Sequence, residues 1–211
     1  MKNIIIATGL FLGTLCNANA GIIEIVPVSY SFDRATDIGS FNYSDWGGIQ
    51  LTDGVYGTNS WAADLGNGPA YEWVGWVNDP IINIDFNLGS IINISKIDIG
   101  TVQDNVNDVV LPSVELFSSQ DAINWTSFSV LNIPESSGNN GQHFTYEFNG
   151  LSVSDQYFRV SLRHSLNGPW TFTDEIDFYQ NTASVPTPTV LSLLVFGLIG
   201  FIGMKKSLKV S

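Results

Sequence analysis

Cysteine is almost absent from the sequence. The 211 residues contain 1 cysteine, Cys16, which lies in an apolar stretch near the N-terminus. A single cysteine cannot form an internal disulfide, so the class of small exported folds stapled by disulfides is excluded. The stability of the fold must therefore come from an apolar core or from a bound metal ion.

Positive charge is also scarce. The sequence has 8 Lys and Arg against 20 Asp and Glu, and its formal net charge is −12. Nucleic acids and anionic membrane surfaces bind basic patches, so this composition argues against a nucleic-acid partner.

Recognisable catalytic motifs are missing. The sequence has neither the G-x-S-x-G motif of serine hydrolases nor the H-E-x-x-H motif of zinc proteases. It has 2 histidines, His143 and His164, and no cysteine near them that could complete a zinc site. A small hydrolase that uses a pair of carboxylates remains an alternative, because the loops contain many Asp residues. We expect a protein that is not an enzyme.

The first 20 residues have the three parts of a secretory signal peptide. Lys2 gives the positive start, residues 4–15 are apolar, and Ala18-Asn19-Ala20 is a cleavage site of small residues. Cleavage after Ala20 would remove Cys16. The alternative is a lipoprotein acylated at Cys16, but the residue before it, Leu15, is too large for such a site. We therefore predict a signal peptide over residues 1–20.

The other end of the chain resembles a membrane-spanning segment. Residues 189–204 carry no charge and are apolar all round, and Lys205, Lys206 and Lys209 follow directly. As a helix, this run would be about 24 Å long, slightly short of the hydrocarbon core of a bilayer. Basic residues beside an apolar span remain in the cytoplasm. The pattern predicts a short transmembrane helix, and a buried core helix is the alternative.

The residues before this run are Val185, Pro186, Thr187 and Pro188. Prolines, a short membrane run and a basic end, in this order, resemble the PEP-CTERM sorting signal of Gram-negative bacteria. The resemblance implies that residues 184–211 are a sorting tail, cleaved by an exosortase-type membrane protease. It also implies export to the cell surface or the extracellular matrix. Thr187 stands where that family usually has Glu.

Residues 21–183 remain, which is the size of one domain. This stretch contains all 20 acidic residues but only 4 basic residues, which gives a net charge near −16. Such a surface is compatible with binding neutral glycans or divalent cations. Solubility alone is the simpler explanation of the charge.

Short strands with period-2 alternation dominate this domain. Apolar residues alternate with polar ones in IINIDFNLG, ISKIDIG, HFTYEFNGL and QYFRVSLRH, while SVELFSS, TSFSVLNI and EIDFYQ are further strand-like runs. Turn residues separate the runs, as in SSGNNGQ and SLNGP. Many short strands at regular spacing predict an all-β fold, an antiparallel sandwich or jelly roll.

Four stretches also resemble the motifs of one known family, in the right order. They are LTDGVYGTNSW, INIDFNLGSIINISKIDI, LPSVELFSSQDAINWTSF and the pair QYFRVSL and TDEIDFY. Together they resemble the discoidin domain, also called the coagulation factor 5/8 C-terminal type. This implies a galactose-binding-like jelly roll, mostly without catalytic activity, that binds ligands through loops at one end. Ala122 replaces a family glycine, and NGPAYEWVGWVND is an insertion.

Glycan-binding relatives of this type hold a structural calcium between the L-x-D-G loop and the start of the last strand. Carried over to this sequence, the resemblance implies Ca²⁺ bound by Asp53 and Glu175, with carbonyl groups near Val55 and Thr58, and with Asp174 as a weaker candidate. Oxygen ligands of this kind suit Ca²⁺. The alternative is that Asp53 only makes the Asp-Gly turn.

A second acidic stretch, DNVNDVVLPSVE, has Asp104, Asp108 and Glu115 at positions 1, 5 and 12 of an EF-hand loop. Val106 and Val109 occupy positions that need a ligand and a glycine. We therefore interpret this stretch as a polar loop.

Aromatic residues in loops are candidates for contacts with sugars, because a flat ring can pack on the C–H face of a sugar while polar side chains bind its hydroxyl groups. Our carbohydrate-binding candidates are Tyr71, Trp73, His143, Arg163, His164 and Trp170. The alternative is that the aromatic residues belong to the core, as the family pattern suggests for Trp61, Trp76 and Trp125.

The sequence thus predicts an exported bacterial protein of the cell surface or extracellular matrix. Its partners would be an exopolysaccharide or another glycan, bound by a calcium-stabilised sandwich, and the processing protease. The alternative is a structural or adhesion protein of the same fold that acts through protein contacts.

Overall fold

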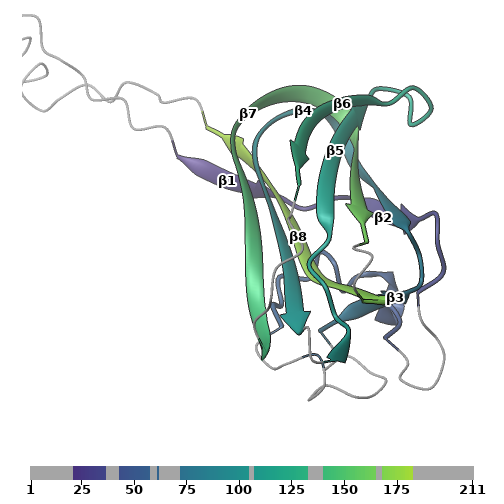
Figure 1. Cartoon of the computed structure of the whole chain (residues 1–211). Helices are drawn as coiled ribbons and strands as arrows, with labels where there is room; N and C mark the ends of the chain where they lie inside the picture. The colour runs from purple at the N-terminus through teal and green to yellow at the C-terminus, as the bar shows by residue number, and fades with distance from the viewer. Residues whose placement is uncertain are drawn as a thin grey trace, which may run out of the picture. The chain divides into compact units, whose positions relative to one another are not determined.

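Eight β-strands form one antiparallel sheet that curls into a two-layered sandwich (Figure 1). The computed structural model describes residues 21–36, 43–57, 61, 72–104, 107–132, 140–164 and 168–182. The strands are β1 (Ile22–Ile25), β2 (Ser29–Phe32), β3 (Val74–Val77), β4 (Ile81–Asp104), β5 (Ser113–Ser119), β6 (Thr126–Leu131), β7 (Asn140–Arg163) and β8 (Trp170–Asn181). One turn of 3₁₀ helix, η1 (Trp46–Gly48), precedes β3.

The two longest strands, β4 and β7, belong to both layers. Ile81–Asn87 of β4 pair with the end of β7 and with β2, and β7 pairs on its other side with β5, which pairs with β6. Lys96–Asp104 of β4 pair with the start of β7 and with β8, and β8 also pairs with β1 and β3. We call these two layers the β5 layer and the β8 layer.

Glycines and irregular pairing let these strands bend from one layer into the other. Gly89 in β4 and Gly150 in β7 have φ values of 81° and 70°, which residues with a Cβ atom rarely adopt. The register of β4 against β7 shifts between Asn87 and Ile92, and such bulges bend a strand. Figure 1 shows both strands curving over the same end of the sandwich.

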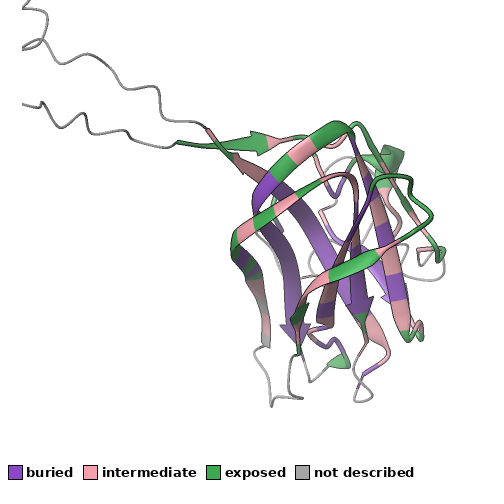
Figure 2. Ribbon diagram, turned by 90° about the horizontal axis from the view of Figure 1, so that it is seen from above, coloured by how far each residue is buried: buried purple, intermediate pink, exposed green. Residues whose placement is uncertain are grey.

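Apolar side chains fill the space between the layers. Figure 2 colours long stretches of the strands around this space as buried. Along β4, Ile82, Ile84 and Phe86 are buried while the residues between them are not. Phe178 of β8 lies 5.0 Å from Phe86 and 5.6 Å from Phe158 of β7, measured between ring centroids. Phe178 therefore joins the β8 layer to the β5 layer.

A second apolar cluster covers the outer face of the β8 layer. Thr171 and Thr173 pair with Trp76 and Val74, whose side chains belong to the core between the layers. Phe172 therefore points to the opposite, outer face. There it forms a buried cluster with Tyr43, Trp73, Val102 and Val109.

Residues 43–57, which we call the covering segment, are hydrogen-bonded to this layer. The N–H of Gly75 donates to the carbonyl of Tyr43 at 3.0 Å, and the N–H of Ile176 donates to the carbonyl of Leu51 at 2.9 Å.

The prediction of an all-β antiparallel sandwich is confirmed. The predicted runs SVELFSS and TSFSVLNI correspond to β5 and β6. The prediction of two strands in IINIDFNLGSIINISKIDIG was wrong, because pairing continues through the bend and gives one strand, β4. The same holds for HFTYEFNGL and QYFRVSLRH, which are both parts of β7.

Both predicted targeting segments, residues 1–20 and 184–211 with the apolar helix 189–204, lie outside the described residues. Within the described ranges, no helix is long and apolar enough to cross a membrane.

Truncation of Phe178 tests whether the two layers depend on this contact. We expect Phe178→Ala to lower the free energy of unfolding by about 3–5 kcal/mol, because a buried aromatic ring is lost from the centre of the core. Ile123→Ala is the control, since Ile123 is 78% exposed. Denaturant unfolding of both variants measures the effect, and equal losses would contradict this role for Phe178.

Candidate functional site

The predicted site residues fall into two groups in the structure. Asp53, Val55, Trp73, His143, Asp174 and Glu175 lie where the covering segment meets the β8 layer. Arg163, His164 and Trp170 lie where β7 ends and β8 begins. Thr58 and Tyr71 are outside the described residues.

Asp174 connects the covering segment to β8 and β7. Its side chain is fully buried. Oδ2 accepts a hydrogen bond from the N–H of Gly57 at 2.6 Å and lies 2.8 Å from Nε2 of His143. Oδ1 accepts a hydrogen bond from the N–H of Glu175 at 2.9 Å. Both oxygens thus have protein partners, so the structure does not favour Asp174 as a metal ligand.

Two glycines make this arrangement possible. A Cβ atom at Gly100 would lie 1.8 Å from Oδ1 of Asp174, and a Cβ atom at Gly57 would lie 2.3 Å from the ring of Trp73. No side chain fits at these distances, so both positions require glycine for the close approach of backbone and side chain.

His143 was predicted to bind a sugar, but its Nε2 faces Asp174. The carboxylate of Asp174 raises the pKa of His143, while burial acts in the opposite direction. Its side chain remains 26% exposed. The ring of His143 packs edge-on against Tyr56, with ring centroids 5.9 Å apart.

The prediction that Trp73 is an exposed loop aromatic was wrong. Its side chain is fully buried in the outer cluster and packs against His143, with ring centroids 5.7 Å apart. The residue directly precedes β3, and its ring lies against Gly57 of the covering segment.

Asp53 and Glu175 lie close together around Gly54. The carboxylate of Glu175 accepts a hydrogen bond from the N–H of Gly54 at 3.1 Å, and that of Asp53 accepts one from the N–H of Val55 at 2.9 Å. Asp53 therefore does make the predicted turn. Burial, with the nearby charges of Asp177 and Asp53, raises the pKa of Glu175 to about 9. Among the described residues, no three Asp, Glu, His or Cys side chains form a metal-binding group.

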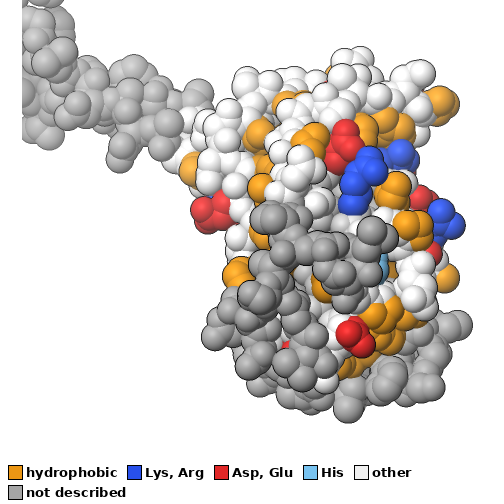
Figure 3. All heavy atoms as spheres, viewed as in Figure 1, with side chains coloured by type: hydrophobic (Ala, Val, Ile, Leu, Met, Phe, Trp, Pro, Cys, Tyr) orange, Lys and Arg blue, Asp and Glu red, His pale blue; other side chains and the backbone are white. Residues whose placement is uncertain are grey.

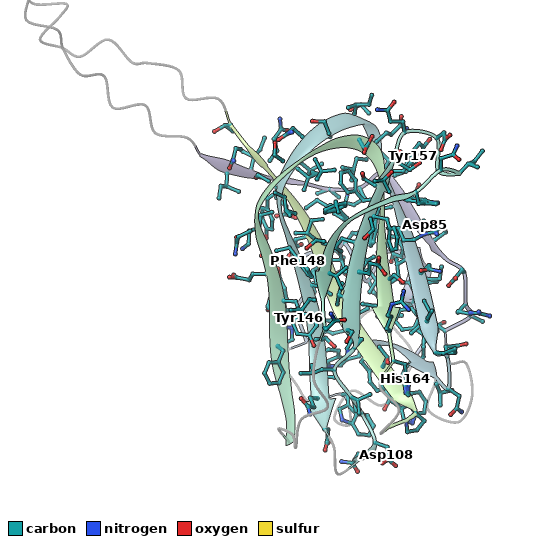
Figure 4. The ribbon with its side chains drawn as sticks, turned by 45° about the horizontal axis from the view of Figure 1, so that its top comes forward. Asp85, Asp108, Tyr146, Phe148, Tyr157 and His164 are labelled. Atoms are coloured by element: carbon teal, nitrogen blue, oxygen red, sulfur yellow. The ribbon has the colours of Figure 1, made fainter. Side chains whose placement is uncertain are left out.

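The second group lies at the end of the sandwich where β4 ends and β8 begins, which we call the loop end. Figure 4 shows His164 and Asp108 together at this end, far from Tyr157. Burial lowers the pKa of His164, and its Nε2 is buried without a hydrogen-bond partner within the described structure. Arg163 forms an ion pair with Glu115 at 3.0 Å.

An aromatic stack lies beside these residues. Phe172 is stacked with Trp61 at 5.6 Å and with Trp170 at 5.5 Å, and Tyr43 packs edge-on against Phe172 at 4.6 Å. Trp61 and Trp170 are partly buried. They therefore lie at the margin of the outer cluster. Trp76 is buried between the layers, which agrees with the interpretation of this residue as part of the core.

Asp104 is a candidate that the sequence did not reveal. Its Oδ2 accepts hydrogen bonds from Nε1 of Trp61 at 3.2 Å and from Nδ2 of Asn107 at 2.7 Å. Its Oδ1 is buried and has no hydrogen-bond partner among the described residues. From the sequence, Asp104 was interpreted as part of a polar loop. Its hydrogen bond with Trp61, which is distant in sequence, identifies it as a candidate site residue.

Comparison with known families agrees with this architecture. The model of the F5/8 type C domain matches residues 37–176, which is more than half of the chain. The chain belongs to the F5/8 type C domain family. No curated protein matches the sequence significantly.

Several solved structures share the F5/8 type C fold. A truncated AlyQ with CBM32 and alginate lyase domains has a TM-score of 0.50 and 12% identity, over 81% of this chain and 36% of that one. This chain therefore spans about a third of that structure. The family 32 carbohydrate-binding module of Clostridium perfringens NanJ, solved with galactose, has a TM-score of 0.46 and 14% identity, over 75% of this chain and 99% of the module. The likeness to the truncated AlyQ shows the fold.

The contact between His143 and Asp174 predicts a specific titration. The pKa of the His143 ring should lie above 6.5, the ordinary value, and should fall in Asp174→Asn, because the carboxylate stabilises the imidazolium. With a raised folded-state pKa, this pair stabilises the domain fully below pH 6.5 and the contribution is lost as pH rises through that pKa. NMR titration of the histidine ring protons measures both values, with His164 as the internal control. An unchanged His143 pKa in Asp174→Asn would rule out the pairing.

Proposed function

We propose that this protein is an exported glycan-binding protein without catalytic activity, and that its ligand binds at the loop end. The observation that carries the proposal is Oδ1 of Asp104, which has no hydrogen-bond partner among the described residues. The same carboxylate accepts a hydrogen bond from Trp61, which stacks on Phe172 as Trp170 does. A carboxylate oxygen accepts hydrogen bonds from sugar hydroxyl groups, while an indole packs against the ring of the sugar. Membership of the F5/8 type C domain family supports this, since the solved relatives include carbohydrate-binding modules.

The polar groups of the described structure support a binding role over catalysis. Asp174 and His143 form a close pair, in which the Nε2 of His143 faces the carboxylate. The other partners of Asp174 are the backbone N–H groups of Gly57 and Glu175. The arrangement fixes the covering segment in place.

We infer export from the sequence alone. The proposed signal peptide, residues 1–20, would direct secretion. The proposed tail, residues 184–211, would hold the protein in the membrane through 189–204 until an exosortase-type protease acts near Val185-Pro186-Thr187-Pro188. The mature protein would then belong to the cell surface or the extracellular matrix.

Structural calcium is also part of the proposal. Glu175 is 1% exposed, and burial, together with the acidic side chains near it, raises its pKa. The described structure places no Lys or Arg against Glu175, so its ionised form lacks a compensating charge. Asp53 and Glu175, with the carbonyl of Val55, are a donor set that suits Ca²⁺. The bound ion would supply positive charge and tie the covering segment to β8.

Calcium should raise the melting temperature of the protein. A ligand that binds only the folded state adds about 2.7 kcal/mol at a hundredfold excess over its Kd. Thermal unfolding with calcium and with chelator measures the shift. Glu175→Gln should abolish the shift, and Glu24→Gln, which removes an exposed carboxylate from β1, should retain it. Equal shifts in both variants would refute the proposed ligands.

Binding of a glycan should depend on the aromatic residues at the loop end. We expect at least one polysaccharide in a panel of neutral, acidic and amino polymers to retard the protein in affinity electrophoresis. Trp170→Ala should lose most of this retardation, because the sugar loses its packing surface. Ile123→Ala is the exposed control. If no polymer retards the native protein, glycan binding is refuted.

An adhesion protein without a sugar site is the second candidate. It is favoured by a run of exposed apolar side chains at the sheet edge formed by β1. Ile22 is 60% exposed and Ile23 47%, and Val26, which directly follows β1, is 63% exposed. An edge strand of this kind is suited to protein contacts. Under this alternative, substitutions in β1 would change adhesion between cells, and Trp170→Ala would not.

A further inference from the structure

The basic side chains of the domain are all paired with carboxylates other than Asp104. Residues 21–183 contain four Lys and Arg. Their ion pairs are Arg34 with Asp79 at 3.9 Å, Lys96 with Asp98 at 2.6 Å, Arg159 with Asp85 at 2.6 Å, and Arg163 with Glu115 at 3.0 Å. Within the part of the domain that the structure describes, none of these cations pairs with Asp104.

The carboxylate of Asp104 therefore has only neutral partners in the described structure. Asp104 is 7% exposed. Oδ2 accepts from the indole of Trp61 and from the amide of Asn107, and Oδ1 accepts from neither. The backbone of Asp104 exchanges two hydrogen bonds with Val109, at 2.9 and 3.0 Å, so the position of the residue is fixed. A buried carboxylate is costly unless a donor or a positive charge compensates it.

The groups around Asp104 also favour a positive charge. Asp108 is exposed in the same turn. Burial lowers the pKa of His164 at this end, which favours the uncharged form of its ring. The indoles of Trp61 and Trp170 attract cations through their π-systems. On the face drawn in Figure 3, an acidic side chain near the loop end lies among hydrophobic ones, while the basic side chains gather farther up, beside other acidic groups.

We propose that the loop-end site binds a cationic glycan, with Asp104 accepting a hydrogen bond from the ammonium group of an amino sugar. This inference rests on the proposed glycan-binding function and narrows its ligand to polymers that carry free amino groups. The net charge of the domain, near −16, attracts such a polymer and repels one built from uronic acids.

A glycan is favoured over a lysine-rich peptide because of the partly buried aromatic rings. Trp61 and Trp170 both stack on the buried Phe172, which fixes the orientation of the two indole rings. Rigid rings next to a hydrogen-bond acceptor match a sugar ring, which carries an apolar face and a polar substituent within one rigid unit. A lysine side chain would interact with the carboxylate of Asp104 through its charge, but it has no rigid ring to pack against the indoles.

The test compares matched oligosaccharides on the full chain by isothermal titration calorimetry. The probes are chitosan oligomers, fully N-acetylated oligomers of the same length, and alginate oligomers. We expect the chitosan oligomer to bind at least tenfold more tightly than the other two. Asp104→Asn should weaken chitosan binding by about 10- to 100-fold, the range for one hydrogen bond to a charged group. Glu24→Gln, which removes the same charge on β1, should change it less than threefold.

Each outcome has a distinct meaning. If the N-acetylated or alginate oligomer binds as tightly as chitosan, the cationic-ligand inference fails while glycan binding stands. The same conclusion follows if Asp104→Asn retains full affinity. If no oligomer binds the native protein, the proposed function itself fails. If polylysine competes as well as chitosan, the partner is a basic protein. Near-ultraviolet circular dichroism shows whether Asp104→Asn folds. If it does not fold, the comparison of the three oligomers on the unmodified chain still tests whether the ligand is cationic.

Discussion

The hydrogen bond between the carboxylate of Asp174 and the backbone N–H of Gly57 holds the covering segment on the β8 layer. It joins residues 117 positions apart. It requires glycine at positions 57 and 100, because a Cβ atom at either would collide with its neighbours. The buried Trp73 and the turn around Gly54 both lie under or beside this contact. The position of Trp73 in the outer cluster and the turn that carries Asp53 therefore depend on one desolvated carboxylate.

Carboxylates are concentrated on the β8 layer. Among the described residues, the buried acidic side chains are Asp98, Asp104, Asp174, Glu175 and Asp177. Lys96 pairs with Asp98 and His143 with Asp174, whereas the other three accept hydrogen bonds from neutral donors. A fold with buried carboxylates and few cations is stabilised by positive charge from outside. Calcium near Glu175 and an ammonium group near Asp104 are two proposals with this one physical origin.

The strands were predictable because burial on one face of a sheet imposes a local period of two. This period is visible in Ile82, Ile84 and Phe86, so the fold class and most of β4, β5 and β7 followed from the sequence. The bends were mistaken for turns between separate strands. The reason is that glycines such as Gly89 and Gly150 occur both in turns between strands and in strongly curved strands. The site was harder to predict. His143 and Asp174 were both proposed, but for different ligands, and the structure brings them together.

Composition and alternation thus determined the all-β class, the acidic surface and the expectation of export, because each is a property of single residues or near neighbours. Tertiary structure decided which side chains are accessible and which charges are compensated. Trp73 is buried because the covering segment packs over it. In the described structure Asp104 lacks a charged partner, because the four Lys and Arg residues of the domain pair with other carboxylates. Such properties depend on contacts between distant parts of the chain, which no local pattern encodes.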